Sequence, residues 1–130
     1  MSLNDIGPSL PGADTVVEWF GKWPSFHDGE VISLELARKG ESVLRLYPYY
    51  PNKPATVDFI FEEITDLELD DFSQQNVIMA LYIEEVVDQT TQKAFRFSLV
   101  PCNGLAGYID ARRVRVQLVP GKSPDGVSSW

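Results

Sequence analysis

The single histidine of the chain, His27, stands beside residues that could assist it in chemistry. Asp28 follows it directly, and Glu30 comes two residues later. A histidine next to a carboxylate is typical of a general base or of a metal ligand. A metal site needs three or four ligands, and the chain has no second histidine to help complete one. We therefore predict neither a bound metal nor another cofactor.

A structural role for His27 is the favoured interpretation. If the next strand begins at Asp28, then Asp28 and Glu30 share one side of it and His27 faces away. We expect Ser25 or Asp28 to cap a turn. His27 is expected to be at least partly buried and bonded to the backbone or to a nearby carboxylate. The alternative is a small hydrolase-like enzyme that uses His27 with Asp28 or Glu30.

Cys102 is the only cysteine and could act as a nucleophile with His27 as its base. It follows Pro101 in an expected loop, 101–107. No nucleophile motif surrounds it, and a lone cysteine near a strand end is typically inert. The sequence leaves enzymatic activity undecided but favours its absence, so we assign no catalytic residue.

Acidic residues dominate the charge of the chain. The net charge is −8, which argues against nucleic-acid binding because a phosphate backbone attracts clustered Lys and Arg. The carboxylates between residues 58 and 71 show no calcium-loop spacing. They alternate with apolar residues, which predicts a solvated strand face or a negative patch for a basic partner; they are Asp58, Glu62, Glu63, Asp66, Glu68, Asp70 and Asp71. The small basic group Arg112, Arg113 and Arg115 is expected to pair with this strand across the sheet.

Three tyrosines surround a loop that prolines keep out of a sheet ladder. Tyr47, Tyr49 and Tyr50 lie among Pro48, Pro51 and Pro54. Exposed aromatic side chains are frequent anchors at protein interfaces. We therefore predict a binding surface made of this loop and part of the acidic strand, namely Tyr47, Tyr49, Tyr50, Glu62, Glu63, Glu68 and Asp70.

One helix is expected near the N-terminus, at about residues 15–21. Thr15 and Glu18 fit a capping box, and Gly21 with Pro24 marks the end. The apolar residues that follow the helical period form one face, which must pack on a sheet because so short a helix is unstable alone; they are Val16, Trp19, Phe20 and Trp23.

From Glu30 onward the apolar period changes from 3.6 to 2, which predicts strands. In the first, Ile32, Leu34 and Leu36 share a face. Residues 57–70 indicate either two strands or one long strand with a bulge near Glu63. Residues 77–87 are apolar on both faces and fit a strand or a helix; the β-branched content favours a strand. The remaining strands are expected at about 42–47, 95–99 and 108–119.

Hairpin-length connections predict a mainly antiparallel α+β fold, with the helix packed on a sheet that curls into a sandwich or an open barrel. We expect an irregular lead-in at 1–12, a single domain at 13–119 and a flexible tail at 120–130. The lone cysteine, the lack of a signal-peptide pattern and the lack of a ~20-residue apolar run favour a cytoplasmic protein that does not enter a membrane.

The stretch Trp23-Pro24-Ser25-Phe26-His27-Asp28-Gly29-Glu30-Val31 also carries a resemblance. With Leu67-Glu68-Leu69 and Phe72, then Gln75-Asn76-Val77-Ile78, then Gly104 and Gly107, it makes residues 13–119 similar to a bacterial family. That family is the one numbered fifty among the immunity proteins of polymorphic toxin systems. The chain departs from it at Gly29, where the family more often has alanine.

The resemblance implies a protein that binds a cognate toxin stoichiometrically and blocks it. It implies no catalytic residues, and it leaves the role of the motif residues Trp23, Phe26, His27, Asp28 and Glu30 open. The partner would be a toxin with a basic surface, whose identity and activity the sequence does not indicate. Oligomeric state is open as well, and a structural or self-assembling module is a further alternative.

Overall fold

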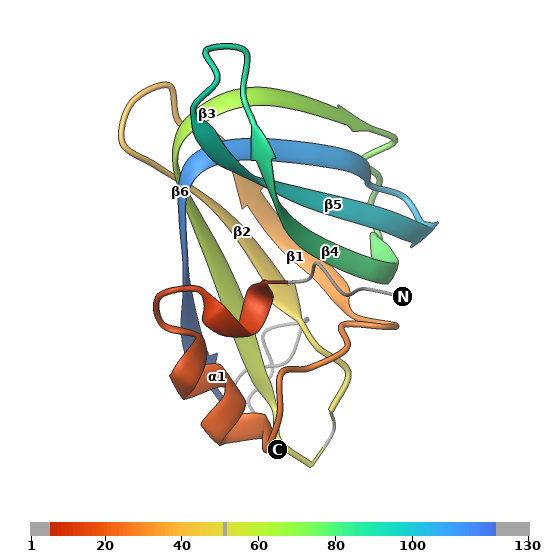
Figure 1. The fold of residues 1–130 in the computed structure, drawn as a ribbon. Coiled ribbons are helices and arrows are strands. Elements are labelled where there is room, and N and C mark those ends of the chain that lie inside the picture. The colour runs from red at the N-terminus through yellow and green to blue at the C-terminus, as the bar shows by residue number, and fades with distance from the viewer. Residues whose placement is uncertain (1–5, 51, 122–130) are drawn as a thin grey trace.

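The protein is mostly antiparallel β-sheet with one short α-helix near the N-terminus (Figure 1). The computed structural model describes residues 6–50 and 52–121, so most of the predicted tail and the first five residues of the lead-in lie outside the described residues. The elements are the 3₁₀ turn η1 (Gly7–Ser9), α1 (Ala13–Phe20), β1 (Glu30–Glu35), β2 (Glu41–Tyr47), β3 (Ala55–Asp70), β4 (Val77–Val87), β5 (Lys93–Asn103) and β6 (Ala106–Pro120). The predicted antiparallel sheet and its helix are confirmed.

The strands are hydrogen-bonded in the order β1-β2-β3-β6-β5-β4. The hairpins β1–β2, β2–β3, β4–β5 and β5–β6 join sequence neighbours, whereas β3 pairs with β6 across the sheet. One residue pair, Glu30 with Val77, joins β1 to β4. Each strand therefore has two neighbours, but some strands have them along only part of their length.

The long strand β3 is the element on which the two parts of the sheet meet. Its first half lies between β2 and β6, and its second half continues beside β6 alone. The register shifts between Ile64 and Asp66, and Glu63 has a φ of +57°. The sequence left two strands or one bulged strand open; the structure has one strand with a bulge, which lets it bend from one part of the sheet into the other.

In most strands the residues that side-chain alternation predicted to be in the core are buried. Leu44 and Leu46 of β2 are buried, as are Val57, Phe59 and Phe61 of β3. Residues 77–87 form the predicted strand. In β1 the phase differs from the prediction, because a bulge between Val31 and Ser33 shifts the faces and β1 ends at Glu35. Leu36, expected in the core, lies beyond that end and is 51% exposed.

The loop predicted at 101–107 is shorter than expected. Strand β5 continues through Pro101 and Cys102 to Asn103, and β6 starts at Ala106. The buried side chain of Asn76 stabilises this tight connection, because its Oδ1 accepts hydrogen bonds from the N–H groups of Leu105 and Ser73, both 2.9 Å long. The hydrogen bonds of this buried amide stabilise a short connection where the sequence predicted a longer loop.

Helix α1 starts two residues earlier than predicted. Its N-cap is Gly12 and it makes no side-chain capping bond, so the predicted capping box at Thr15 is wrong. Its end at Phe20, followed by Gly21 in a left-handed conformation, is confirmed. The helix packs against β6, where Val116 N–H donates a 2.9 Å hydrogen bond to the Pro11 carbonyl. Val16 is fully buried in that contact, while Trp19, Phe20 and Trp23 are partly buried.

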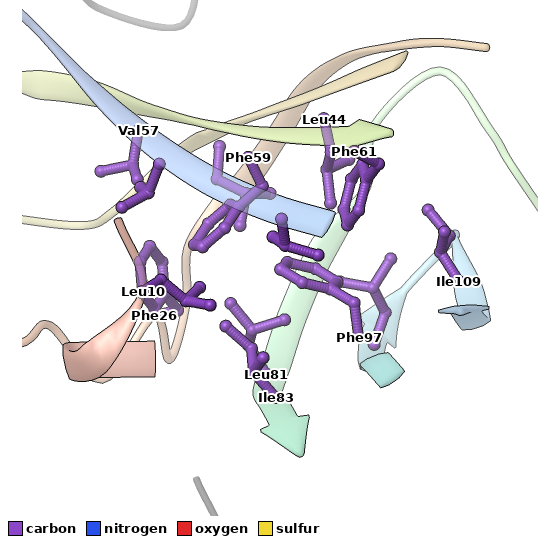
Figure 2. Close-up of a cluster of buried hydrophobic side chains, with 14 of the residues drawn as sticks. Leu10, Phe26, Leu44, Val57, Phe59, Phe61, Leu81, Ile83, Phe97 and Ile109 are labelled. Carbon is purple, nitrogen blue, oxygen red and sulfur yellow. The ribbon is translucent and has the colours of Figure 1, made fainter. Parts of the chain in front are cut away.

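Aromatic rings from both parts of the sheet and from the segment after α1 form the core (Figure 2). Phe59 lies 4.7 Å from Phe97 and 5.7 Å from Phe26 between ring centroids. Trp23 lies 5.7 Å from Phe26 by the same measure. In the segment that follows α1, Phe26 is therefore the residue whose ring packs into the core. Within the described residues, no helix is long and apolar enough to cross a membrane.

Candidate protein-binding groove

A groove lies between the tip of the β1–β2 hairpin and the bend of β3. It encloses about 560 Å³ and is lined from the hairpin by residues 36–40 and from β3 by Glu62, Glu63, Ile64 and Leu67. Ser42 of β2 and Arg113 of β6 complete it. We call this hollow the hairpin groove.

The hairpin groove has exposed apolar side chains on opposite walls. Leu36 of the hairpin is 51% exposed and Leu67 of β3 is 40% exposed, while Ile64 is half-buried and packs on the core. Exposed leucines facing one concave surface are typical of sites that bury apolar groups of a ligand. The groove can therefore exclude water from an apolar side chain.

Charged residues of both signs surround this apolar surface. Arg113 donates to Glu62 Oε1 at 3.1 Å and lies 3.4 Å from Glu63 Oε1. The hydrogen bond to Glu62, together with the charge of Glu63, raises the pKa of Arg113. Arg38 and Lys39 lie on the opposite wall. An apolar centre with a polar rim is the usual anatomy of a protein-binding surface.

The predicted acidic surface is only partly present. Asp58 is buried instead of solvated, because it lies opposite Arg45 and is held by it. Glu62 and Glu63 line the hairpin groove, while Glu68 and Asp70 lie farther along β3 and are exposed. The expected cross-sheet pairing of the arginines is confirmed for Arg113; Arg115 pairs with Glu41 and Arg112 with Asp88.

The tyrosine loop does not join these carboxylates in one surface. In the β2–β3 ladder Glu62 lies opposite Glu41, at the start of β2, whereas Tyr47 is at the far end of that strand. Tyr47 is buried, and burial raises its pKa. The Tyr50 ring packs against the Phe20 ring in a tilted arrangement, with 5.0 Å between ring centroids, and the Tyr50 hydroxyl accepts a 3.3 Å hydrogen bond from Ser25 N–H. Only Tyr49, 63% exposed, is available as an anchor.

His27 is exposed, so the expectation that it is partly buried is wrong. Its side chain is 59% exposed and its Nδ1 lies 3.3 Å from Asp28 Oδ2. It is at the outer corner of a turn in which Phe26 and Asp28 both have positive φ values and Gly29 N–H donates to the Phe26 carbonyl. This turn directs Phe26 inward and His27 outward. Its contact with a carboxylate agrees with the prediction, but an exposed pair contributes little to stability.

Cys102 is exposed and free, and strand β4 separates it from the His27 turn. Asp28 N–H bonds the carbonyl of Ile78 in β4, and Ile78 pairs on its other side with Pro101. The nucleophile and base considered from the sequence thus belong to segments on opposite sides of a strand. Among residues 6–50 and 52–121, no group of three or more His, Cys, Asp or Glu side chains is placed to hold a metal ion.

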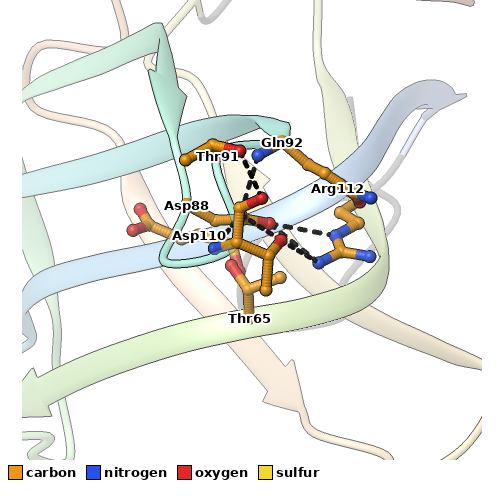
Figure 3. A network of polar contacts seen from close by, with 7 residues as sticks. Thr65, Asp88, Thr91, Gln92, Asp110 and Arg112 are labelled. Carbon is orange, nitrogen blue, oxygen red and sulfur yellow. Dashed lines mark hydrogen bonds and ion pairs between the residues drawn. The ribbon is translucent and has the colours of Figure 1, made fainter.

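A second hollow, of about 320 Å³, was not predicted from the sequence. It lies where the β4–β5 turn folds over β6, with Asp88 and Arg112 directed toward one another (Figure 3). Asp88 Oδ2 accepts hydrogen bonds from Arg112 at 2.9 and 3.1 Å. Arg96 holds Asp110 in the same hollow with bonds of 2.8 and 2.9 Å. Each of these two arginines is thus bonded to a carboxylate of the same hollow. We therefore assign the hollow a structural role.

Comparison with known proteins yields no relative: no protein-family model, no curated protein and no solved structure matches the chain.

Proposed function

We propose that this protein binds a cognate bacterial toxin in a one-to-one complex and neutralises it, as an immunity protein does. The hairpin groove is the observation that carries the proposal, since it combines exposed leucines, a charged rim and a volume that can accept side chains of a partner. The resemblance of residues 13–119 to an immunity family supports a toxin as the partner.

Charge supports the same proposal. The net charge of −8 favours rapid encounter with a basic surface, and such steering weakens as salt screens charges beyond ~8 Å at physiological ionic strength. Electrostatic complementarity mainly sets the association rate and the specificity. Affinity would come from burying Leu36 and Leu67.

Of the sandwich and the open barrel that the sequence left open, we favour the open barrel as the scaffold of this surface. The first and last strands in the pairing order meet at Glu30 and Val77 and then part. The hairpin tip and the bend of β3 can then form two walls of one groove.

The experiment measures binding of the purified protein to a toxin encoded beside its own gene, by surface-based kinetics at several salt concentrations. Leu36→Asp and Leu67→Asp should each weaken the complex by about tenfold or more, because a buried carboxylate replaces an apolar contact. Met79→Asp is the matched control, since Met79 is 48% exposed but lies on β4 outside the hairpin groove.

The proposal requires that Met79→Asp bind as tightly as the unaltered protein and that all three variants keep its melting temperature. It is wrong if no neighbouring gene product binds, or if the two groove variants bind as well as the control. A complex that contains two or more copies of this chain would contradict the one-to-one stoichiometry.

A further inference from the structure

The second half of β3 has hydrogen-bonding capacity that the sheet does not use. Pairing of β2 with β3 ends at Glu41 and Glu62, whereas β6 stays paired with β3 as far as Asp70. Residues 63–70, here called the edge segment, therefore have a strand on one side only. In Figure 1 this half of β3 runs beside β6, with β5 and β4 beyond it. A strand edge of this length is a template for adding another strand.

One contact partly protects the edge segment. Asp66 Oδ1 accepts a 2.8 Å hydrogen bond from Leu67 N–H, and Asp66 Oδ2 accepts one of 2.9 Å from the Tyr108 hydroxyl. Within the described residues, no backbone bond joins the β2 side of the edge segment to another segment. The exposed N–H and C=O groups can therefore form hydrogen bonds with an incoming chain. Asp66 must then release the N–H of Leu67.

Side chains on the edge segment alternate in chemistry as well as in direction. Leu67 lies opposite the buried Ile109, so it belongs to the inner face, which continues into the hairpin groove. Glu68 lies opposite Tyr108, on the outer face. Asp66 and Asp70 are two residues away on either side and share that outer face. The edge thus has leucine on one side and three carboxylates on the other.

We propose that the edge segment binds an extended segment of a partner protein as an added strand. The added strand has Lys or Arg at alternate positions, opposite Asp66, Glu68 and Asp70, and apolar residues between them that enter the hairpin groove. Opposite charges on directly paired residues stabilise a sheet, whereas like charges destabilise it. This inference rests on the proposed function, because it names the chemistry that the groove recognises in its partner.

The same charges argue against a second copy of this chain as the occupant. Edge-to-edge pairing of two copies would place the carboxylates of one edge segment against those of the other. Carboxylates at alternate positions would also repel the phosphates of a nucleic acid. A basic, extended polypeptide is the ligand whose charge matches the outer face and whose backbone matches the edge.

The direct test uses a synthetic peptide of about eight residues, the length of the edge segment, in which Lys alternates with Val. A second peptide of the same composition has its lysines in one block. Binding is measured by titration calorimetry, and amide hydrogen exchange is followed residue by residue. The alternating peptide should bind more tightly than the block peptide and slow exchange of amides in residues 63–70, with no change in α1.

Charge reversal supplies the second measurement. The double variant Glu68→Lys with Asp70→Lys should lower the affinity for the alternating peptide by about tenfold. The control is Asp14→Lys with Glu18→Lys, which makes the same charge change on the exposed face of α1 and should have a much smaller effect. Equal weakening by both double variants would mean that net charge alone attracts the peptide, and would overturn the proposal.

Further outcomes separate this inference from the proposed function. If a neighbouring toxin binds, loses affinity on Leu36→Asp, and leaves exchange in the edge segment unchanged, then strand addition is wrong and the proposed function stands. If the alternating peptide protects the edge segment but no neighbouring product binds, strand addition stands and the immunity role is wrong. Equal binding of the alternating and block peptides rejects strand addition.

Discussion

Arg45 of β2 holds the carboxylate of Asp58 of β3 with two hydrogen bonds, Nε to Oδ1 and Nη2 to Oδ2, each 2.8 Å long. The two residues lie directly opposite one another, and the Asp58 side chain is only 8% exposed. The hydrogen bond with Asp58 raises the pKa of Arg45. This pair stabilises the part of β3 that precedes its bend and thus supports one wall of the hairpin groove.

Arg45→Met should lower the free energy of unfolding by about 2 kcal/mol, because it leaves a nearly buried carboxylate without its partner while keeping the apolar stem. Chemical denaturation monitored by circular dichroism measures the change. Arg115→Met is the control: Arg115 and Glu41 are each 45% exposed, so its cost should be about 0.5 kcal/mol. Equal costs for the two variants would show that the Arg45 pair is no stronger than a surface pair.

Asp88 should make stability depend on pH in the acid range. The Thr90 hydroxyl holds its pKa far below the usual value; the N–H groups of Gln92 and Thr90 and the Arg112 guanidinium add to this, against the opposing effect of burial. A lowered folded-state pKa stabilises the protein above the unfolded pKa of about 3.9. That stabilisation is lost as the pH falls below that value toward the folded pKa.

The Asp88→Asn variant tests this dependence. It should melt at a lower temperature than the unaltered protein at pH 7, and the difference should shrink as the pH falls below about 4. Asp71→Asn is the control, because Asp71 is exposed and does not line the hollow that contains Asp88 and Arg112. A melting-temperature difference for Asp88→Asn that stays constant from pH 7 to about pH 2 would contradict the assignment.

Gly107 permits close approach of β6 to the edge segment. It has a φ of +130°, and a Cβ there would collide with the backbone carbonyl oxygen of Glu68. Gly107→Ala should therefore destabilise the protein by about 2 kcal/mol more than Gly40→Ala, by strain and overpacking together. Gly40 also has a positive φ, of +87°, but a Cβ there meets nothing within 4 Å. Thermal unfolding of both variants checks the difference; equal losses would show that backbone strain alone matters.

The local sequence pattern predicted those elements whose form depends on neighbouring residues. The spacing of two residues between Leu44 and Leu46, and between Phe59 and Phe61, identified buried strand faces, and Gly21 marked the end of α1. The β-branched content of residues 77–87 distinguished a strand from a helix. Such features succeed because side-chain period, glycine conformation and proline geometry act over a few residues.

Local pattern failed where a distant segment decides the environment of a residue. Asp58 was predicted to be solvated but is buried beside Arg45, and His27 was predicted to be at least partly buried but is turned outward while Phe26 fills the core. Tyr50 looked like an exposed anchor but is half-buried and packs against the Phe20 ring. The partner in each case is set by packing, which a period of two or 3.6 does not encode.

The candidate site depends most strongly on tertiary structure. By itself, the sequence determined that the chain is acidic, that its strands are antiparallel, and that acidic and apolar residues alternate through residues 66–70. Only the fold decided that β6 pairs along nearly all of β3 while the shorter β2 stops at Glu41, and this difference leaves the edge segment open beside Leu36. The physical reason is that strand pairing is a long-range contact, whose partner and extent depend on how the whole sheet closes around its core.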